Sequence, residues 1–222
     1  MLSPVTIVPG MYPATKRGRG PVRKYTLTMT LQGIDPPIWR MFDIPSNVSL
    51  QFLSDFLMSV MGYEWDNYYG FFKAGNWYSP YSNLDYGKVK HRYSIDKFAL
   101  SDLLAENGDC MIYEFNSLGG WQHDLKLVSV AEYGKDEPKI IHYLGGERAC
   151  PVEGSEGPEH YTQILSAFMK KKAGERLTPE EESDVDIYFY MKKDFEDKPN
   201  QFHIDRDLDY YSDRLCSRRK KS

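Results

Sequence analysis

The chain has 222 residues, of which 41% are hydrophobic and 14% aromatic, so it is long enough to build one domain around its own core. Its formal net charge of -4 comes from an acidic body between two basic ends. No apolar stretch approaches the roughly 20 residues that a membrane-spanning helix needs, which excludes that class and predicts a cytoplasmic protein without membrane contact.

The two ends of the chain differ from its body in composition. Residues 1–24 contain five lysines and arginines, four prolines and no acidic residue, a composition with almost nothing to bury, so a flexible basic arm is predicted. Residues 216–222 contain four more basic residues and are predicted to form a basic tail. The folded domain is therefore expected over residues 25–215. Basic ends can contact nucleic acid by counterion release, but such tails are more often only solvated.

The first predicted strand and helix follow the arm. Apolar residues alternate with threonines over residues 25–31, which predicts a strand with one buried face. Asn47 or Ser49 can cap a helix whose apolar residues recur at helical spacing from residue 50 until Gly62, a residue type that favours a helix end. This helix is expected to pack on the sheet.

The middle of the chain predicts more strands. Aromatic residues over 68–79 surround a Gly75-Asn76 turn, which predicts a hairpin, and residues 101–105 predict a single helical turn. Residues 109–115 and 121–130 are predicted to form the next pair of strands. In the second of these, one face is apolar apart from His123.

The last part of the chain predicts mainly helices. A short strand is expected at 140–144 and a loop at 145–159, followed by helices at 159–172, 179–194 and 205–215. Thr178-Pro179-Glu180-Glu181 is typical of a helix start, because threonine caps, proline suits the first turn and glutamate favours the positive helix end. Together these elements predict an α+β single domain with a largely antiparallel sheet and helices packed on it.

The run Pro36-Pro37-Ile38-Trp39-Arg40 is the most distinctive local motif. Two prolines fix the backbone and remove two amide donors, so the chain must leave the preceding strand before Trp39 and Arg40. Trp39 is expected to anchor the core, so that Trp39→Ala would cost about 3–5 kcal/mol, and Arg40 to pair with a carboxylate. In the alternative, the two side chains grip a planar or anionic ligand.

Four separated segments give the chain a family resemblance. They are Pro36 to Arg40, Met61-Gly62-Tyr63, Tyr113-Glu114-Phe115 with Trp121-Gln122-His123, and Gly146 to Glu153. With these segments in this order, residues 25–215 resemble the plasmid pRiA4b ORF-3-like family. The resemblance implies a compact α+β domain and no established activity. Some relatives carry the label of a transposon resolvase, and some look fused to DNA-binding or zinc-finger modules.

The chain departs from the family pattern at several polar positions. Asn116-Ser117 stands where the family has a glycine and an aspartate, Asn67 where it has a histidine, and Val152 and Gly154 where it has a proline and an aspartate. A catalytic or metal site built from those groups would be weakened in this chain. We therefore expect no tightly bound metal and no cofactor.

His123, Glu153 and Cys150 are the candidate catalytic residues. A hydrolytic metal site needs three protein ligands and an open position for water, and a nucleophilic cysteine needs a nearby base and a lowered pKa. The alternative is a structural network in which these groups satisfy buried polar atoms. Cys110, Cys150 and Cys216 are widely spaced, so reduced thiols rather than disulfides are expected.

Trp39, Arg40, Trp121 and Tyr161 are the candidate binding residues, because aromatic side chains and arginine are the usual anchors of interfaces. The favoured function is a non-enzymatic binding or regulatory protein of the mobile-element type that acts through protein–protein contacts. One alternative is a hydrolase or nucleic-acid-processing enzyme that uses His123, Glu153 and Cys150. Another is a nucleic-acid-associated protein that uses the basic ends.

Overall fold

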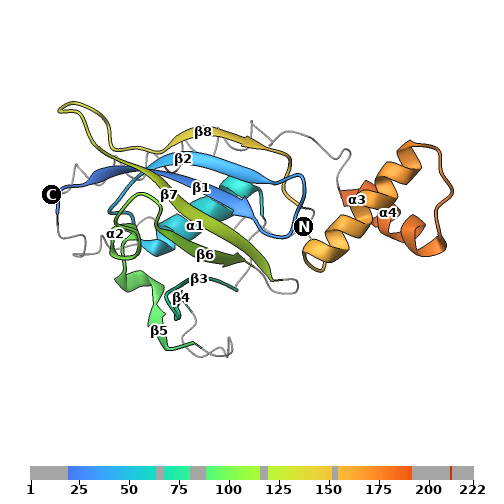
Figure 1. The fold of residues 1–222 in the computed structure, drawn as a ribbon, viewed down its shortest axis with the longest axis horizontal. Coiled ribbons are helices and arrows are strands. Elements are labelled where there is room, and N and C mark those ends of the chain that lie inside the picture. Colours follow the sequence, from blue (N-terminus) through green and yellow to red (C-terminus); the bar gives the residue numbers. More distant parts are fainter. Residues whose placement is uncertain are drawn as a thin grey trace, which may run out of the picture.

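A computed structural model describes residues 20–63, 68–80, 89–115, 120–151, 155–191 and 211, and the side chains of 187–191 are not described. Its centre is an eight-stranded sheet in the order β5-β4-β3-β6-β7-β1-β2-β8 (Figure 1). All neighbouring strands pair antiparallel except β4 and β5, which are parallel. The chain is thus a single α+β domain with a largely antiparallel sheet, as the sequence predicts.

The elements follow one another along the chain with these bounds. The strands are β1 Arg23–Leu31, β2 Trp39–Pro45, β3 Tyr69–Lys73, β4 Asn76–Ser79, β5 His91–Ser94, β6 Cys110–Phe115, β7 Trp121–Glu132 and β8 His142–Glu147. The helices are α1 Leu50–Met61, the short η1 Ile95–Lys97, α2 Leu100–Leu103, α3 Pro158–Lys172 and α4 Pro179–Met191.

Several boundaries differ from the sequence prediction. Strand β1 begins at Arg23, inside the predicted arm, and β8 begins at His142 rather than 140. The hairpin turn is Ala74-Gly75, both with positive φ (53° and 85°), while Asn76 already belongs to β4. Residues 1–19 and the tail 216–222 lie outside the described residues, and of the predicted helix 205–215 the structure describes Tyr211.

Strand β2 was not predicted, and its sequence explains why. Its inward positions are Arg40, Phe42 and Ile44, whereas Trp39 and Met41 point to the other face. A charged residue therefore stands on the buried side and two apolar residues on the exposed side. This arrangement hides the period of two that identifies a half-buried strand.

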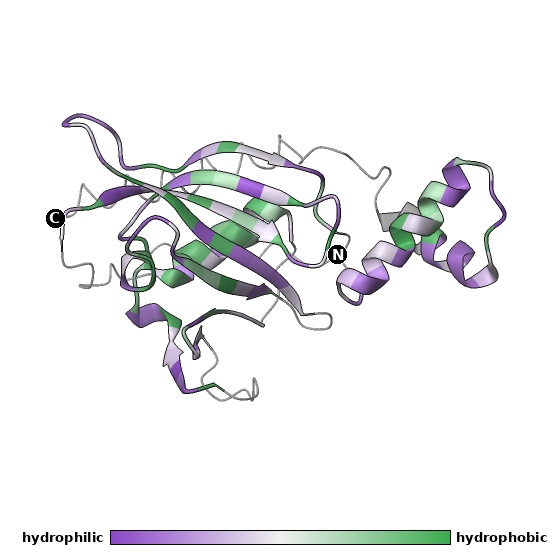
Figure 2. Ribbon diagram, in the orientation of Figure 1, coloured by the Kyte–Doolittle hydropathy of each residue, from purple (hydrophilic) through white to green (hydrophobic). Residues whose placement is uncertain are grey.

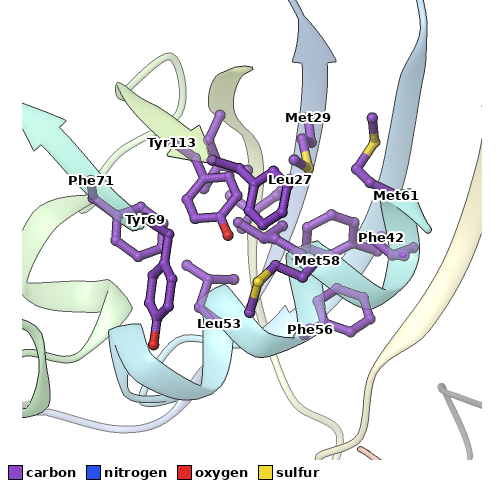
Figure 3. Packing of buried hydrophobic residues seen from close by; sticks show 14 of the residues in the cluster. Leu27, Met29, Phe42, Leu53, Phe56, Met58, Met61, Tyr69, Phe71 and Tyr113 are labelled. Atoms are coloured by element: carbon purple, nitrogen blue, oxygen red, sulfur yellow. The ribbon is translucent and has the colours of Figure 1, made fainter. Parts of the chain in front are cut away.

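Helix α1 lies across one face of the sheet, which we call the inner face (Figures 1 and 3). Every residue of α1 is buried except Gln51 and Ser59, and the contact includes an edge-to-face pair between Phe42 and Phe56 with ring centroids 4.8 Å apart. Each large apolar side chain buried here stabilises the fold by about 1.5–3 kcal/mol. Figure 2 shows α1 as the most uniformly hydrophobic helix.

The predicted ends of α1 are confirmed. The Ser49 hydroxyl accepts a hydrogen bond from the Phe52 amide at 3.1 Å, and Gly62 ends the helix with φ of 91°. A left-handed residue at that position is the usual helix stop, and glycine adopts it without steric cost.

Helices α3 and α4 form a hairpin beyond one end of the sheet (Figure 1). The predicted start of α4 is confirmed, because the Glu181 amide donates to Thr178 Oγ1 at 3.2 Å and Glu181 Oε2 accepts from the Thr178 amide at 2.8 Å. Lys170 of α3 pairs with Glu181 at 2.5 Å. No helix in the described part of the chain is long and apolar enough to cross a membrane.

Candidate functional site

Side chains from all four distinctive sequence segments meet on the inner face, beside the C-terminal end of α1. They are Arg40 from β2, Tyr63 after α1, His123 from β7 and Cys150 after β8, and we call them the motif cluster. All four are buried, with His123 at 0%, Arg40 at 1%, Cys150 at 6% and Tyr63 at 8% exposure. The sequence pattern predicts that His123 faces inward, and the structure confirms it.

His123 is held by two hydrogen bonds that fix its tautomer. Its Nδ1 lies 3.2 Å from the Tyr113 carbonyl oxygen, which can only accept, so Nδ1 carries the proton. Its Nε2 lies 2.8 Å from the Tyr63 hydroxyl and therefore accepts the phenolic proton. Burial lowers the pKa of His123 from 6.5 to about 3, so the imidazole is neutral at ordinary pH.

Arg40 uses its guanidinium to join three elements through backbone carbonyls. Its Nε donates to the Val60 carbonyl at 3.0 Å, and its Nη1 donates to the carbonyls of Trp39 at 2.8 Å and Glu147 at 3.0 Å. The last carbonyls of a helix lack intrahelical donors, so Arg40 satisfies part of the α1 end. Burial lowers the pKa of Arg40. The prediction that Arg40 pairs with a carboxylate is wrong, because in the described residues its hydrogen-bond acceptors are backbone carbonyls. The carbonyls at the C-terminal end of α1 carry partial negative charge, which favours a positive guanidinium there.

The glycine of the fourth segment leaves room for this arginine. A Cβ on Gly146 would lie 2.6 Å from the Trp39 carbonyl oxygen and 2.9 Å from Arg40 Cδ. No side chain fits at those distances, so glycine at position 146 is a packing requirement.

Cys150 is sealed beside the same network. Its Sγ donates to the Pro151 carbonyl at 3.2 Å, and its thiol lies beside the Tyr63 hydroxyl. Burial raises the pKa of Tyr63 well above its usual value, so this phenol stays protonated and is no base for the thiol. Glu153, the third candidate catalytic residue, lies outside the described residues.

The motif cluster offers no metal site in the described part of the chain. No group of three or more histidine, cysteine, aspartate and glutamate side chains is placed there to hold an ion. Both ring nitrogens of His123, and Nε and Nη1 of Arg40, are hydrogen-bonded to protein groups instead, which is the arrangement of a structural network.

Ile38, rather than Trp39, is the core residue of the Pro36 to Arg40 motif. Ile38 is fully buried, whereas Trp39 is half-buried on the other face of the sheet, where its Nε1 donates to Glu147 Oε2 at 3.1 Å. Its ring covers Gly145 of β8, whose missing Cβ would lie 3.8 Å from Trp39 Cη2. The prediction that Trp39 anchors the core is wrong, because β2 enters the sheet in the register that turns even-numbered residues inward.

Trp121 and Tyr161 are brought together, but inside the protein. Their rings pack edge to face with centroids 6.2 Å apart, at 7% and 3% exposure, and they tie β7 to α3. Burial raises the pKa of Tyr161 to about 12. Both side chains are nearly fully buried in the structure, and their role as binding residues, which no finding tests, stays a prediction.

Sequence reasoning missed Tyr63 and Tyr113 as partners of His123. Tyr63 lies 60 residues from His123 along the chain, and Tyr113 contributes a backbone carbonyl, so no local spacing marks either contact. The available signal was a histidine on an otherwise apolar strand face, which requires buried hydrogen-bonding partners.

The opposite, outer face of the sheet carries the accessible polar side chains. Two rows of cross-strand neighbours run over β2, β1 and β7: Trp39–Thr30–Asp124 and Met41–Thr28–Lys126. Asp124 and Lys126 are exposed, while Trp39, Met41 and the threonines are partly exposed. In Figure 1 no described helix lies in front of β1, β2 and β7, the strands that carry these residues.

Comparisons with known proteins agree with this fold. The sequence profile described as plasmid pRiA4b ORF-3-like protein matches residues 23–205. The chain is also similar to the crystal structure of a protein of unknown function, MM3350 from Methanosarcina mazei Go1, with 22% identity, a TM-score of 0.62, and coverage of 81% of this chain and 95% of that chain. At this identity the likeness shows the fold alone. No curated protein matches the chain.

Proposed function

This chain belongs to the plasmid pRiA4b ORF-3-like family, and we propose that it is a non-enzymatic binding protein that acts through contacts with a protein partner. The family description refers to a plasmid reading frame, which supports a regulatory role of the mobile-element type. Cys110 and Cys150 form no disulfide with each other, which is the usual state of cysteines in the cytoplasm and supports that location.

One observation carries the proposal: His123 and Cys150, the two candidate catalytic residues that the structure describes, are buried and hydrogen-bonded inside the protein. His123 has no exposed surface, is neutral, and uses both ring nitrogens in internal hydrogen bonds. A general base must reach the proton of a substrate, either directly or through one water molecule. His123 has no such access, and Cys150 is only 6% exposed.

The outer face is the surface that we propose for the partner. Trp39 presents part of its indole there, held by Glu147, next to Met41 and between exposed charges. A held aromatic ring loses little conformational freedom on binding, which is one reason that tryptophan recurs as an interface anchor. The mixed charges of Asp124 and Lys126 favour a polar protein surface over a nucleic-acid backbone, which would require a positive face.

The test is quantitative affinity capture from lysate of the native host, followed by binding measurements with the purified partner. We expect the wild-type protein to retain a stoichiometric protein partner, and Trp39→Ala to weaken its Kd at least about tenfold. Thr178→Ala, in the α3–α4 hairpin, is the matched control and should bind normally.

The competing enzyme hypothesis gives a different result. A turnover assay on ester, phosphoester and peptide substrates would support it if activity appeared and was lost in Cys150→Ser at an unchanged melting temperature. That outcome would overturn the binding-protein proposal.

A further inference from the structure

The two rows of cross-strand neighbours on the outer face come from the same three strands, which lie side by side in Figure 1. Each strand contributes two residues that are two positions apart, one to each row. We call them the Trp39 row (Trp39–Thr30–Asp124) and the Met41 row (Met41–Thr28–Lys126). The rows therefore run parallel across β2, β1 and β7, about 7 Å apart at the ordinary rise of a strand. All their side chains are at least partly exposed.

The two rows match each other strand by strand. On β2 both residues are large and apolar, on β1 both are threonine, and on β7 they are the opposite charges Asp124 and Lys126. The match continues on β6, where Ile112 extends the Trp39 row and Cys110 extends the Met41 row. A two-fold axis midway between the rows exchanges them. In a second copy stacked face to face about this axis, each residue would meet its counterpart from the other row.

The charges of the two rows favour a second copy as the occupant of this face. Asp124 and Lys126 are exposed, and neither forms an ion pair with another residue that the structure describes. Asp124 Oδ1 accepts a hydrogen bond from the neutral amide Gln32 Nε2 at 2.7 Å. About the two-fold axis, Asp124 of each copy faces Lys126 of the other copy. The contact therefore contains two opposite-charge pairs, which symmetry supplies without any further requirement on the sequence.

We propose that the protein forms a homodimer in which the outer faces of two copies pack against each other about this two-fold axis. This inference rests on the proposed function, because it names a second copy of the chain as the protein partner of the outer face. Two sheets pack in this way in β-sandwiches, about 10 Å apart and with nearly aligned strands. The threonines at the centre are short, so the sheets can approach there. Trp39 of each copy then covers Met41 of the other and removes apolar surface from water.

The test is analytical ultracentrifugation of the full-length protein and two charge-reversal variants. The wild type should form a dimer of two 25.8 kDa chains. Asp124→Lys sets lysine against lysine in both inter-copy pairs, and Lys126→Asp sets aspartate against aspartate. We expect each variant alone to weaken the dimer at least about tenfold. Their melting temperatures should stay those of the monomer fold, because both positions are exposed.

Mixing the two variants is the decisive step. A heterodimer of Asp124→Lys with Lys126→Asp again contains two opposite-charge pairs, so the equimolar mixture should associate as the wild type does. Glu175→Lys, at an exposed position between α3 and α4, makes the same change in net charge as Asp124→Lys and should leave the dimer unchanged. A mixture that associates no more than the separate variants would overturn the proposal.

A wild-type protein that stays monomeric at every concentration would also overturn the dimer. This failure is distinguishable from a failure of the proposed function. If the monomer binds a different protein and Trp39→Ala weakens that binding, the outer face is a partner surface and only the dimer is wrong. If neither a second copy nor another protein binds the outer face, both proposals are wrong.

Discussion

The two faces of the sheet differ most clearly at the neighbouring residues Trp39 and Arg40. Arg40 points to the inner face, is 1% exposed and bonds to three carbonyls, whereas Trp39 points to the outer face and bonds to one exposed carboxylate. The charged residue is the structural one and the aromatic residue is the accessible one. Residue type alone therefore does not reveal which residues of this chain are available to a partner.

The largest effect should come from removing Arg40. Arg40→Met leaves the carbonyls of Val60 and Glu147 without their donor inside the protein, and we expect the free energy of unfolding to fall by about 3–5 kcal/mol. Denaturant unfolding measures this directly. A loss below about 1 kcal/mol would mean that the inner face does not depend on this network.

His123 should make the inner face sensitive to acid. Because its pKa is lowered to about 3 from 6.5, the unfolded chain binds the proton first, so stability is complete above pH 6.5 and decreases as the pH falls towards 3. The difference over this window is roughly 4 kcal/mol. In His123→Gln this part of the pH dependence should disappear. An unchanged pH profile in that variant would assign the acid sensitivity to other groups.

Loss of the α4 cap should destabilise the α3–α4 hairpin without destabilising the sheet. Thr178→Ala removes the side-chain cap of α4, and we expect a cost of about 1 kcal/mol. Hydrogen exchange should accelerate in the first turn of α4 while the sheet amides stay protected. Faster exchange throughout the sheet would show that the hairpin and the sheet unfold as one unit.

The smallest effect on stability should come from Trp39. Since its indole is half-buried and its hydrogen bond is exposed, Trp39→Ala should cost under about 1 kcal/mol, whereas Ile38→Ala should cost about 2–5 kcal/mol. Denaturant unfolding of the two variants compares the free energy lost on the accessible face with that lost in the core. Equal costs would place Trp39 in the core, as its sequence motif first suggests.

The sequence predicted those strands, helices and caps that depend on residues close together in the chain. The alternation of β1, the caps of α1 at Ser49 and Gly62, and the capping box at Thr178 are all confirmed. Each depends on residues within a few positions of one another, so the sequence contains the whole signal.

The contacts that join distant segments were not predictable in this way. Strand β2 was missed because Arg40 occupies an inward position, and the carbonyl partners of Arg40 lie up to 107 residues away. Backbone carbonyls have no residue identity, so no sequence pattern marks them as acceptors. The pairing of Tyr63 with His123 has the same character, because it depends on how α1 crosses the sheet.

The tautomer and titration of His123 test the central claim most directly. Nitrogen-15 NMR of the imidazole should show a neutral ring protonated at Nδ1, with no titration between about pH 5 and 8, because the ring is sealed between Tyr63 and Tyr113. A ring with a pKa near its ordinary value of 6.5, or one that carries its proton on Nε2, would contradict the account. His123 would then again be a candidate for catalysis.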